Sequence, residues 1–365
     1  MGQQNTNAII ENCRYCLMCR HVCPVGHVTR KETLTPHGWG LTIASVKRGL
    51  LTWNPETVDV LYSCADCGTC RAFCVTDQAL PDAIAATRAE VAGRGLAPAA
   101  ALEIHQAIQE WSNPYEKKKP EAARGQGEYA LFVGDDARYL WPEGLDAALK
   151  LLAAVGVKPV RIGAGRSNGY LPSSLGFPET ARKLAQATLT ELKSSGAKCL
   201  LVLTPGVQYA FSSLLTERLG IEWPKGIEIR EVLSLLEEKS ADGKLDLKPS
   251  DDQRPYSYID PTHSLRVPAR HAAPRHLLTR ILPGAGRELF WRKERSHPAG
   301  NGALQFTSPH ISAHLTYSRL ADAQQAGARV IISEDPGCLS HLQRHADRFG
   351  LQVQGLYELL AGQLA

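Results

Sequence analysis

The spacing of apolar residues divides the chain into two parts. Up to about residue 110, short apolar runs alternate with polar ones, and residues 77–108 are rich in alanine and other helix formers. Thr35 followed by Pro36 has the form of an N-cap and a first helical residue, so a helix is expected to begin there. This pattern predicts a small, mostly helical domain over residues 1–110.

From Glu128 onward, short β-rich runs alternate with helical ones, which is typical of parallel α/β units. Between the two parts, residues 111–127 carry Asn-Pro, Lys-Lys-Lys-Pro and Gly-Gln-Gly without apolar periodicity, so a linker is expected. The expected strands are residues 129–133, 159–162, 199–203, 256–259 and 329–332.

The second part is internally repeated. Residues 197–207 match residues 328–338, and in both copies an amphipathic helix ending in glycine, Gly196 or Gly327, comes before the match. The repeat predicts two similar α/β lobes, and the chain as a whole is expected to be an α+β multidomain protein. The predicted lobes cover residues 128–248 and 249–365.

Two cysteine runs share the spacing Cys-x2-Cys-x2-Cys-x3-Cys, the bacterial ferredoxin signature for cubane iron–sulfur clusters. In such pairs of runs, three cysteines bind one cluster and the fourth binds the other. We therefore predict two [4Fe–4S] clusters in a helical ferredoxin domain. The first is assigned to Cys13, Cys16, Cys19 and Cys74, and the second to Cys64, Cys67, Cys70 and Cys23.

Zinc and disulfides are the alternatives for these cysteines. Four-cysteine zinc sites usually pair two C-x2-4-C knuckles, whereas these runs place three cysteines at successive triplets. Disulfides are disfavoured because the runs are closely spaced and no export signal precedes them.

Composition restricts the partners and the compartment. A net charge of +4 is too small and dispersed to indicate nucleic acid, and no run of eighteen apolar residues predicts a membrane span. The polar start lacks an apolar signal region, so a cytoplasmic location is expected, with any membrane association made through a partner.

Three further features have two interpretations each. Cys199 lies inside an apolar run and is expected to be core, and Cys338 follows a Pro-Gly turn, where packing is favoured over reactivity. The arginine-rich residues 263–297 indicate either a docking face for an acidic partner or an anionic cofactor, or a solvated helix face, and the solvated face is favoured.

The cysteine runs followed by two lobes resemble the iron–sulfur subunits of the glycolate oxidase, anaerobic glycerol-3-phosphate dehydrogenase and heterodisulfide reductase group, over nearly the whole chain. In that group each lobe carries a cysteine-rich CCG motif. Here the matching positions, such as Gly134-Asp135 and Asp260-Pro261-Thr262, lack cysteine, and only Cys338 remains, opposite Val207 in the first lobe. The resemblance implies degenerate CCG lobes that have lost their own cluster site.

These observations predict an electron-transfer subunit with no catalytic residues of its own. By the resemblance, it relays electrons from a flavoprotein dehydrogenase subunit through the two clusters to a quinone or another carrier. One alternative is a catalytic CCG-type reductase with a substrate or cofactor site near Cys338, Asp260, His263 and Asp335. Another is a redox-sensing iron–sulfur protein.

Overall fold

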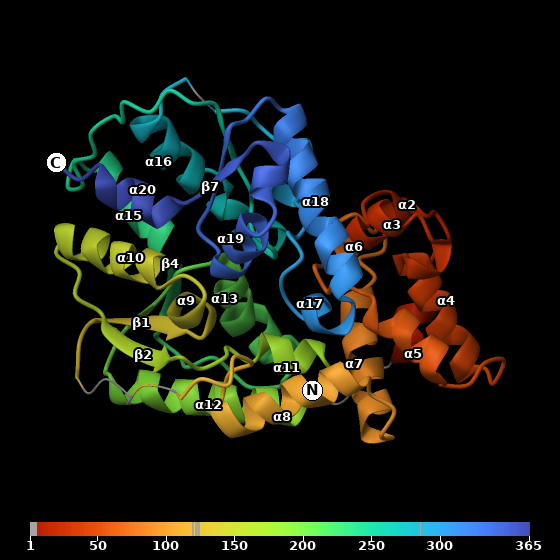
Figure 1. Ribbon diagram of the computed structural model, residues 1–365. Coiled ribbons are helices and arrows are strands. Elements are labelled where there is room, and N and C mark those ends of the chain that lie inside the picture. The colour runs from red at the N-terminus through yellow and green to blue at the C-terminus, as the bar shows by residue number, and fades with distance from the viewer. Residues whose placement is uncertain (1–5, 119, 121–124, 285) are drawn as a thin grey trace.

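The computed structural model describes residues 6–118, 120, 125–284 and 286–365. Its N-terminal part is helical, as the sequence predicts, and Figure 1 shows it at one side of the molecule in red and orange. Its helices are α1 (Thr6–Glu11), α2 (Met18–His21), α3 (Pro24–Thr29), α4 (Pro36–Lys47), α5 (Pro55–Tyr62), α6 (Thr69–Ala72), α7 (Leu80–Gly93) and α8 (Ala99–Trp111).

Helix α4 begins where the sequence predicts. The Thr35 hydroxyl accepts the backbone N–H of Gly38 at 3.3 Å, and Pro36 is the first helical residue. The helix buries Trp39 and Ile43 against the neighbouring N-terminal helices. Their core continues into the C-terminal part of the chain, since Ile311 and Leu315 belong to the same cluster.

The rest of the chain contains two parallel sheets. The first has the strand order β2-β1-β3-β4, and the second has the order β5-β6-β7. Their strands are β1 (Tyr129–Gly134), β2 (Val160–Ala164), β3 (Cys199–Val202), β4 (Glu228–Glu231), β5 (Tyr256–Tyr258), β6 (Val330–Ser333) and β7 (Gln352–Gly355).

Helices connect these strands and cover the sheets, and in Figure 1 α17 and α18 lie between the second sheet and the N-terminal helices. Around the first sheet are α9 (Asp136–Tyr139), α10 (Pro142–Ala154), α11 (Tyr170–Ser174), α12 (Pro178–Ser194), α13 (Pro205–Tyr209), α14 (Leu215–Glu217) and α15 (Val232–Ala241). Around the second are α16 (Ala273–Ile281), α17 (Leu304–Thr307), α18 (Pro309–Gln325), α19 (Pro336–Gln343) and α20 (Leu356–Gly362).

All five expected strands are present, but β4 and β7 are not among them. Both are edge strands with charged or polar residues at alternate positions, Glu-Ile-Arg-Glu and Gln-Val-Gln-Gly, so neither forms an apolar run. In the expected linker, residues 119 and 121–124 lie outside the described residues. Asn113, also in that stretch, is buried, and its amide donates to the carbonyls of Trp111 and Lys117 at 2.9 and 2.8 Å.

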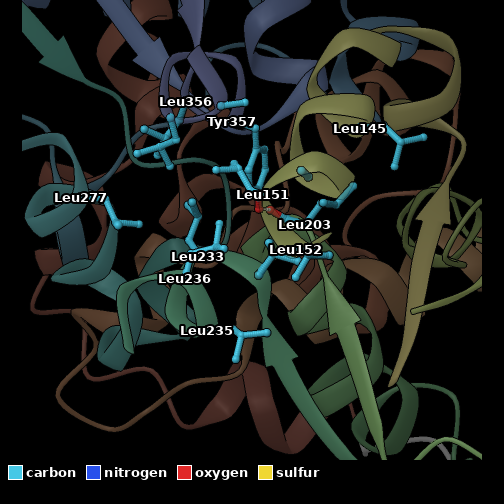
Figure 2. Packing of buried hydrophobic residues seen from close by; sticks show 14 of the residues in the cluster. Leu145, Leu151, Leu152, Leu203, Leu233, Leu235, Leu236, Leu277, Leu356 and Tyr357 are labelled. Carbon is cyan, nitrogen blue, oxygen red and sulfur yellow. Dashed lines mark hydrogen bonds between the residues drawn. The ribbon is translucent and has the colours of Figure 1, made fainter. Parts of the chain in front are cut away.

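One apolar core joins the two sheets. Figure 2 shows leucines of α10 and α15 packed against residues of α16 and α20. The Tyr357 hydroxyl of α20 donates to the carbonyl of Leu203, at the end of β3, at 2.7 Å. Each fully buried leucine contributes roughly 1.5–3 kcal/mol, so this shared core is a strong reason for the two sheets to keep one relative orientation.

Candidate iron–sulfur centres and an adjoining cavity

The two cysteine loops have the same backbone geometry. The residues on either side of the middle cysteine, Tyr15 and Leu17 in the first loop, have φ angles of 54° and 61°. Their counterparts in the second loop, Asp66 and Gly68, have φ angles of 50° and 88°. In both loops the N–H two residues after the first cysteine points at its sulfur, at 3.4 and 3.3 Å. Such a turn curls the chain around one centre and directs N–H groups at the thiolates.

The first thiol group consists of Cys13, Cys16, Cys19 and Cys74, and the structure brings these side chains together. Burial, together with the charges of Cys13, Cys74 and Cys16, raises the pKa of Cys19 to about 11. The two segments are fastened together because the Asn12 amide donates to the carbonyl of Thr76, and the Thr76 hydroxyl donates to the carbonyl of Asn12.

The second thiol group consists of Cys23, Cys64, Cys67 and Cys70, and all four line one cavity of about 280 Å³. Burial raises the pKa of each of these thiols, that of Cys64 to about 12. Besides Cys64, which accepts the N–H of Asp66, two other sulfurs of this group have hydrogen-bond partners. The N–H of Gly26 donates to Cys23 at 3.4 Å, and the Thr69 hydroxyl lies 3.3 Å from Cys67.

The two thiol groups are neighbours. Burial and the charges of the other three cysteines of the second thiol group raise the pKa of Cys70, and the charge of Cys19 adds to this effect. Cys19 and Cys70, one from each thiol group, therefore lie near one another. Each group also draws one cysteine from the other run, Cys74 in the first and Cys23 in the second. No disulfide joins any of the ten cysteines, all of which lie within the described residues.

The second thiol group fits a cubane cluster on a further observation. Arg266 lies against the Cys64–Cys70 loop so closely that a Cβ at Gly68 would overlap its guanidinium. Its Nε and Nη2 atoms are buried and find no hydrogen-bond partner among the described residues. Burying unpartnered donors is unfavourable, and the sulfurs of an anionic cluster would be their acceptors. In the described part of the chain no group of three His, Cys, Asp or Glu is arranged to hold a single metal ion, whereas the thiolates of a cubane bind four different irons.

An ion pair anchors the second loop to the first sheet. Both Nη atoms of Arg218 contact the Asp66 carboxylate at 2.7 Å, and its Nε contacts Asp82 at 2.6 Å. Burial alone would raise the pKa of Asp66, but the charge and hydrogen bonds of Arg218 lower it to about 2. The loop is therefore held by charged groups that are themselves buried.

A second cavity lies between the carboxyl ends of the two sheets, with about 960 Å³ of empty space that is partly open to solvent. It is called the inter-sheet cavity below. Residues that follow β1, β3 and β6 line it, which is the position where open parallel sheets bind ligands. Its polar side chains are Tyr115, Asp135, Asp136, Ser167, Asn168, Tyr170, Thr204, Thr262, His263, Asn301, Gln305 and Asp335.

The residues of the catalytic alternative do not form one site. Cys338 is buried in the core of the second sheet, where burial raises its pKa, and Asp260 is buried in an ion pair with Arg275 at 2.8 Å. Only His263 and Asp335 reach the inter-sheet cavity. Cys199 is buried in the core, as predicted.

The favoured interpretation of residues 263–297 as a solvated face is wrong for its central arginines. Arg270 is 2% exposed and pairs with Glu231 and Glu334, and Arg275 pairs with Asp260 and Glu288. These arginines join segments inside the protein, so their charges are neutralised internally. Sequence reasoning also missed Arg218 and the contact of Arg266 with the second loop, because partners so distant in sequence leave no local pattern.

The comparisons with known proteins agree with the cysteine geometry. The model of the 4Fe-4S dicluster domain matches residues 9–77, which include both cysteine runs, and the model of the CCG cysteine-rich domain matches residues 258–343. These matches confirm the resemblance to iron–sulfur subunits with CCG domains. No curated protein matches the chain.

One solved structure supports the fold. It is described as the crystal structure of a hypothetical protein from Helicobacter pylori, and it matches with a TM-score of 0.64 and 12% sequence identity. The match covers 98% of this chain and 76% of the other. At this identity the likeness shows a shared fold alone.

Proposed function

We propose that this iron–sulfur protein, with its dicluster and CCG domains, is the electron-transfer subunit of a multi-subunit oxidoreductase. In this proposal Cys13, Cys16, Cys19 and Cys74 hold one [4Fe–4S] cluster, and Cys64, Cys67, Cys70 and Cys23 hold the second. A cubane takes up and releases one electron at a time, which suits a relay between a flavoprotein dehydrogenase subunit and a quinone or another carrier.

The observation that carries the proposal is the exchange of cysteines between the two runs. Cys74 lies among the thiols of the first run, and Cys23 lines the cavity formed by those of the second. Cys19 and Cys70, one from each thiol group, come near one another. Two centres built this way would be close enough for an electron to pass from one to the other inside the protein.

The surroundings of the two thiol groups favour one order of transfer. Cys16 is exposed, and around it Tyr15, Met18 and Val75 are 64%, 44% and 72% exposed. Exposed apolar side chains beside a redox centre are typical of a surface that a protein partner covers. Cys23, Cys64 and Cys67 are buried. We infer that the flavoprotein docks over the first thiol group and that electrons then move inward to the second.

We also propose that both sheets descend from a CCG unit. The matched CCG domain, residues 258–343, runs from the last residue of β5 through β6 to the end of α19. The first sheet supports a second copy because β3 and β6 each lead into a proline-initiated helix, capped by the Thr204 hydroxyl in one case and the Asp335 carboxylate in the other. The first copy lacks the CCG cysteines and the second keeps only Cys338, so in this proposal both serve as a scaffold.

The expected location is the cytoplasm, with membrane association only through a partner. Among the described residues, no helix has the length and apolar character to span a membrane.

The test is the cofactor content and redox behaviour of the full chain purified without oxygen. We expect about eight iron and eight acid-labile sulfide per chain, and two separate one-electron reductions in a titration followed by electron paramagnetic resonance. Zinc in place of iron, or clusters that take up no electrons, would overturn the proposal.

A further inference from the structure

The inter-sheet cavity shares a wall with the second cysteine loop. The hydroxyl of Tyr170 donates to the carbonyl of Asp66 at 3.3 Å, and Nε2 of His263 lies 3.3 Å from the same oxygen. Both side chains line the cavity, and Asp66 directly precedes Cys67. Between a molecule in the cavity and Cys67 of the second thiol group would therefore lie the side chain of Tyr170 or His263 and the backbone of Asp66.

His263 is held so that its ring can interact with both the second cysteine loop and the inter-sheet cavity. Its ring stacks on Tyr209 at 4.6 Å and meets Tyr170 edge-on at 4.7 Å. Burial and the charge of Arg266 lower its pKa to about 3, so the ring is neutral. With Nε2–H donating to the Asp66 carbonyl, Nδ1 is left as an acceptor, and it faces Gly206 in the cavity wall.

Carboxyl groups from both sheets converge on the cavity. Asp135 and Asp136 follow β1, and Asp335 follows β6. Burial raises the pKa of all three, that of Asp335 to about 7, and the charge of Asp136 adds to the effect on Asp335. Carboxyl groups that keep their protons near neutral pH can donate hydrogen bonds and protons to a ligand.

Two buried polar atoms of residues lining the cavity lack partners. Asn301 Oδ1 and Thr262 Oγ1 find no hydrogen-bond partner among the described residues, although the Asn301 amide group donates to Asp335 at 3.2 Å. The cavity also has an apolar portion formed by Phe132, Leu140, Leu171 and Val207. Apolar walls with a few converging polar groups are the usual form of a small-molecule site.

We propose that the inter-sheet cavity binds a quinone-type acceptor, a conjugated ring with two carbonyl oxygens, and that this acceptor is reduced there. The inference rests on the proposed function, because the acceptor would receive its electrons from the cluster that the second thiol group is proposed to hold. The apolar walls would hold the ring, the carboxyl groups would donate to its carbonyl oxygens, and Asn301 and Thr262 would accept from the hydroxyls of the product.

The reaction balances with the electrons of the second cluster and the carboxyl groups that line the cavity. The ring dicarbonyl takes up two electrons, one at a time, past Cys67 and Asp66, and two protons, from Asp335 and Asp135, which solvent replaces. Both C=O groups become C–OH, and the product is the hydroquinone. A conjugated ring is required because the one-electron intermediate must spread its unpaired electron. An anionic hydroxy acid is a poor fit, since it has no conjugated dicarbonyl that could take up the two electrons.

The first test measures binding of 2-methyl-1,4-naphthoquinone to the full, cluster-loaded chain by equilibrium dialysis. A Cβ at Gly206 would lie 3.8 Å from both His263 Nδ1 and Thr204 Oγ1, so Gly206→Leu should fill the cavity without displacing backbone. We expect saturable binding at one site and at least a tenfold loss of affinity in this variant. Gly93→Leu is the matched control, because a Cβ there meets nothing within 4 Å.

The second test separates this inference from the proposed function. The dithionite-reduced protein is mixed with either the naphthoquinone or ferricyanide, an acceptor that needs no site. Failure to react with ferricyanide would overturn the relay itself. One other outcome would overturn only the inter-sheet site. In it, ferricyanide oxidises the protein normally, while the rate of oxidation by the quinone does not saturate with quinone concentration and is unchanged in Gly206→Leu.

Asp335→Asn provides a test that does not depend on filling the cavity. Asparagine can still accept the N–H of Cys338, but it cannot release a proton. Quinone binding should persist while its reduction slows by roughly ten- to a hundredfold, at the low end of what a positioned acid supplies. An unchanged rate of quinone reduction, or binding of glycolate at the same site in competition with quinone, would contradict the proposal.

Discussion

Arg218 and Asp66 form a bidentate ion pair, with both Nη atoms 2.7 Å from the carboxylate oxygens and both side chains almost wholly buried. Arg218 directly follows α14 beside the first sheet, whereas Asp66 lies between Cys64 and Cys67. This pair connects the second cysteine loop to the α/β part of the chain, so the loop depends on the rest of the protein for its position.

Replacing Arg218 with methionine should destabilise the protein strongly. The change leaves Asp66 and Asp82 buried without their cation, which typically costs about 3–5 kcal/mol when one partner of a buried pair is removed. The free energy of unfolding by denaturant measures the effect. The control is Arg254→Met, which breaks the more exposed pair with Asp252 and should cost less than about 1 kcal/mol. Equal effects of the two variants would show that the Arg218 pair does not anchor the loop.

Gly68→Ala should remove the second cluster. Gly68 has a φ of 88°, and its Cβ would overlap the guanidinium of Arg266. We expect roughly half of the iron to be lost while the first cluster remains, measured as iron per chain. Gly95→Ala separates strain from overlap, since Gly95 also has a positive φ, 73°, but a Cβ there meets nothing within 4 Å. If both variants keep all their iron, the contact with Arg266 has no bearing on cluster binding.

The charge of Arg266 should raise the reduction potential of the second cluster. Its guanidinium lies 4.3 Å from the Tyr209 ring centroid, and its Nε and Nη2 have no hydrogen-bond partner in the part of the chain that the structure describes. Its charge lowers the pKa of Cys67 against the opposing effect of burial. A nearby cation and hydrogen-bond donors favour the more negative, reduced form of a cluster.

We expect Arg266→Gln to lower the midpoint potential of the second cluster and to leave the first unchanged, in a redox titration followed by electron paramagnetic resonance. Arg266→Lys keeps the charge and should cause a smaller decrease. Equal shifts in both clusters, or no shift, would contradict this role of Arg266.

The N-terminal helices and the dicluster domain could be predicted because their signals are local. The cysteine spacing and the Thr35-Pro36 start of α4 each lie within a few residues. Strands β4 and β7 were missed because edge strands can carry polar residues on both faces. Asp135 and Asp335 lie two and three residues beyond the ends of predicted strands, so the sequence alone could indicate polar groups at the carboxyl ends of both sheets. Only the packing of the two sheets shows that their carboxyl ends meet.

Asp335 should make the stability of the protein depend on pH. Burial, followed by the charge of Asp136, raises its pKa from 3.8 to about 7. Between about pH 4 and pH 7 the folded state keeps a proton that the unfolded chain has released, so this residue's contribution to stability falls as pH rises. The difference corresponds to roughly 4 kcal/mol at most.

Asp335→Asn should therefore match the unchanged protein in stability near pH 4 and exceed it near pH 8. The comparison of the two proteins across pH isolates Asp335 from other titrating groups, and thermal unfolding monitored by circular dichroism measures it. A stability difference that does not vary with pH would mean that Asp335 is ionised in the folded protein.

The exchange of cysteines between the runs is tested most directly by Cys23→Ser and Cys74→Ser, compared by electron paramagnetic resonance of the reduced proteins. Cys23 lines the cavity of the second run's thiols, and Cys74 lies among those of the first. We predict that Cys23→Ser alters only the signal of the cluster bound by Cys64, Cys67 and Cys70, and that Cys74→Ser alters only the other. If each serine instead alters the cluster bound by its own run, the cysteines are not exchanged, and the proposed ligand sets of the two clusters are wrong.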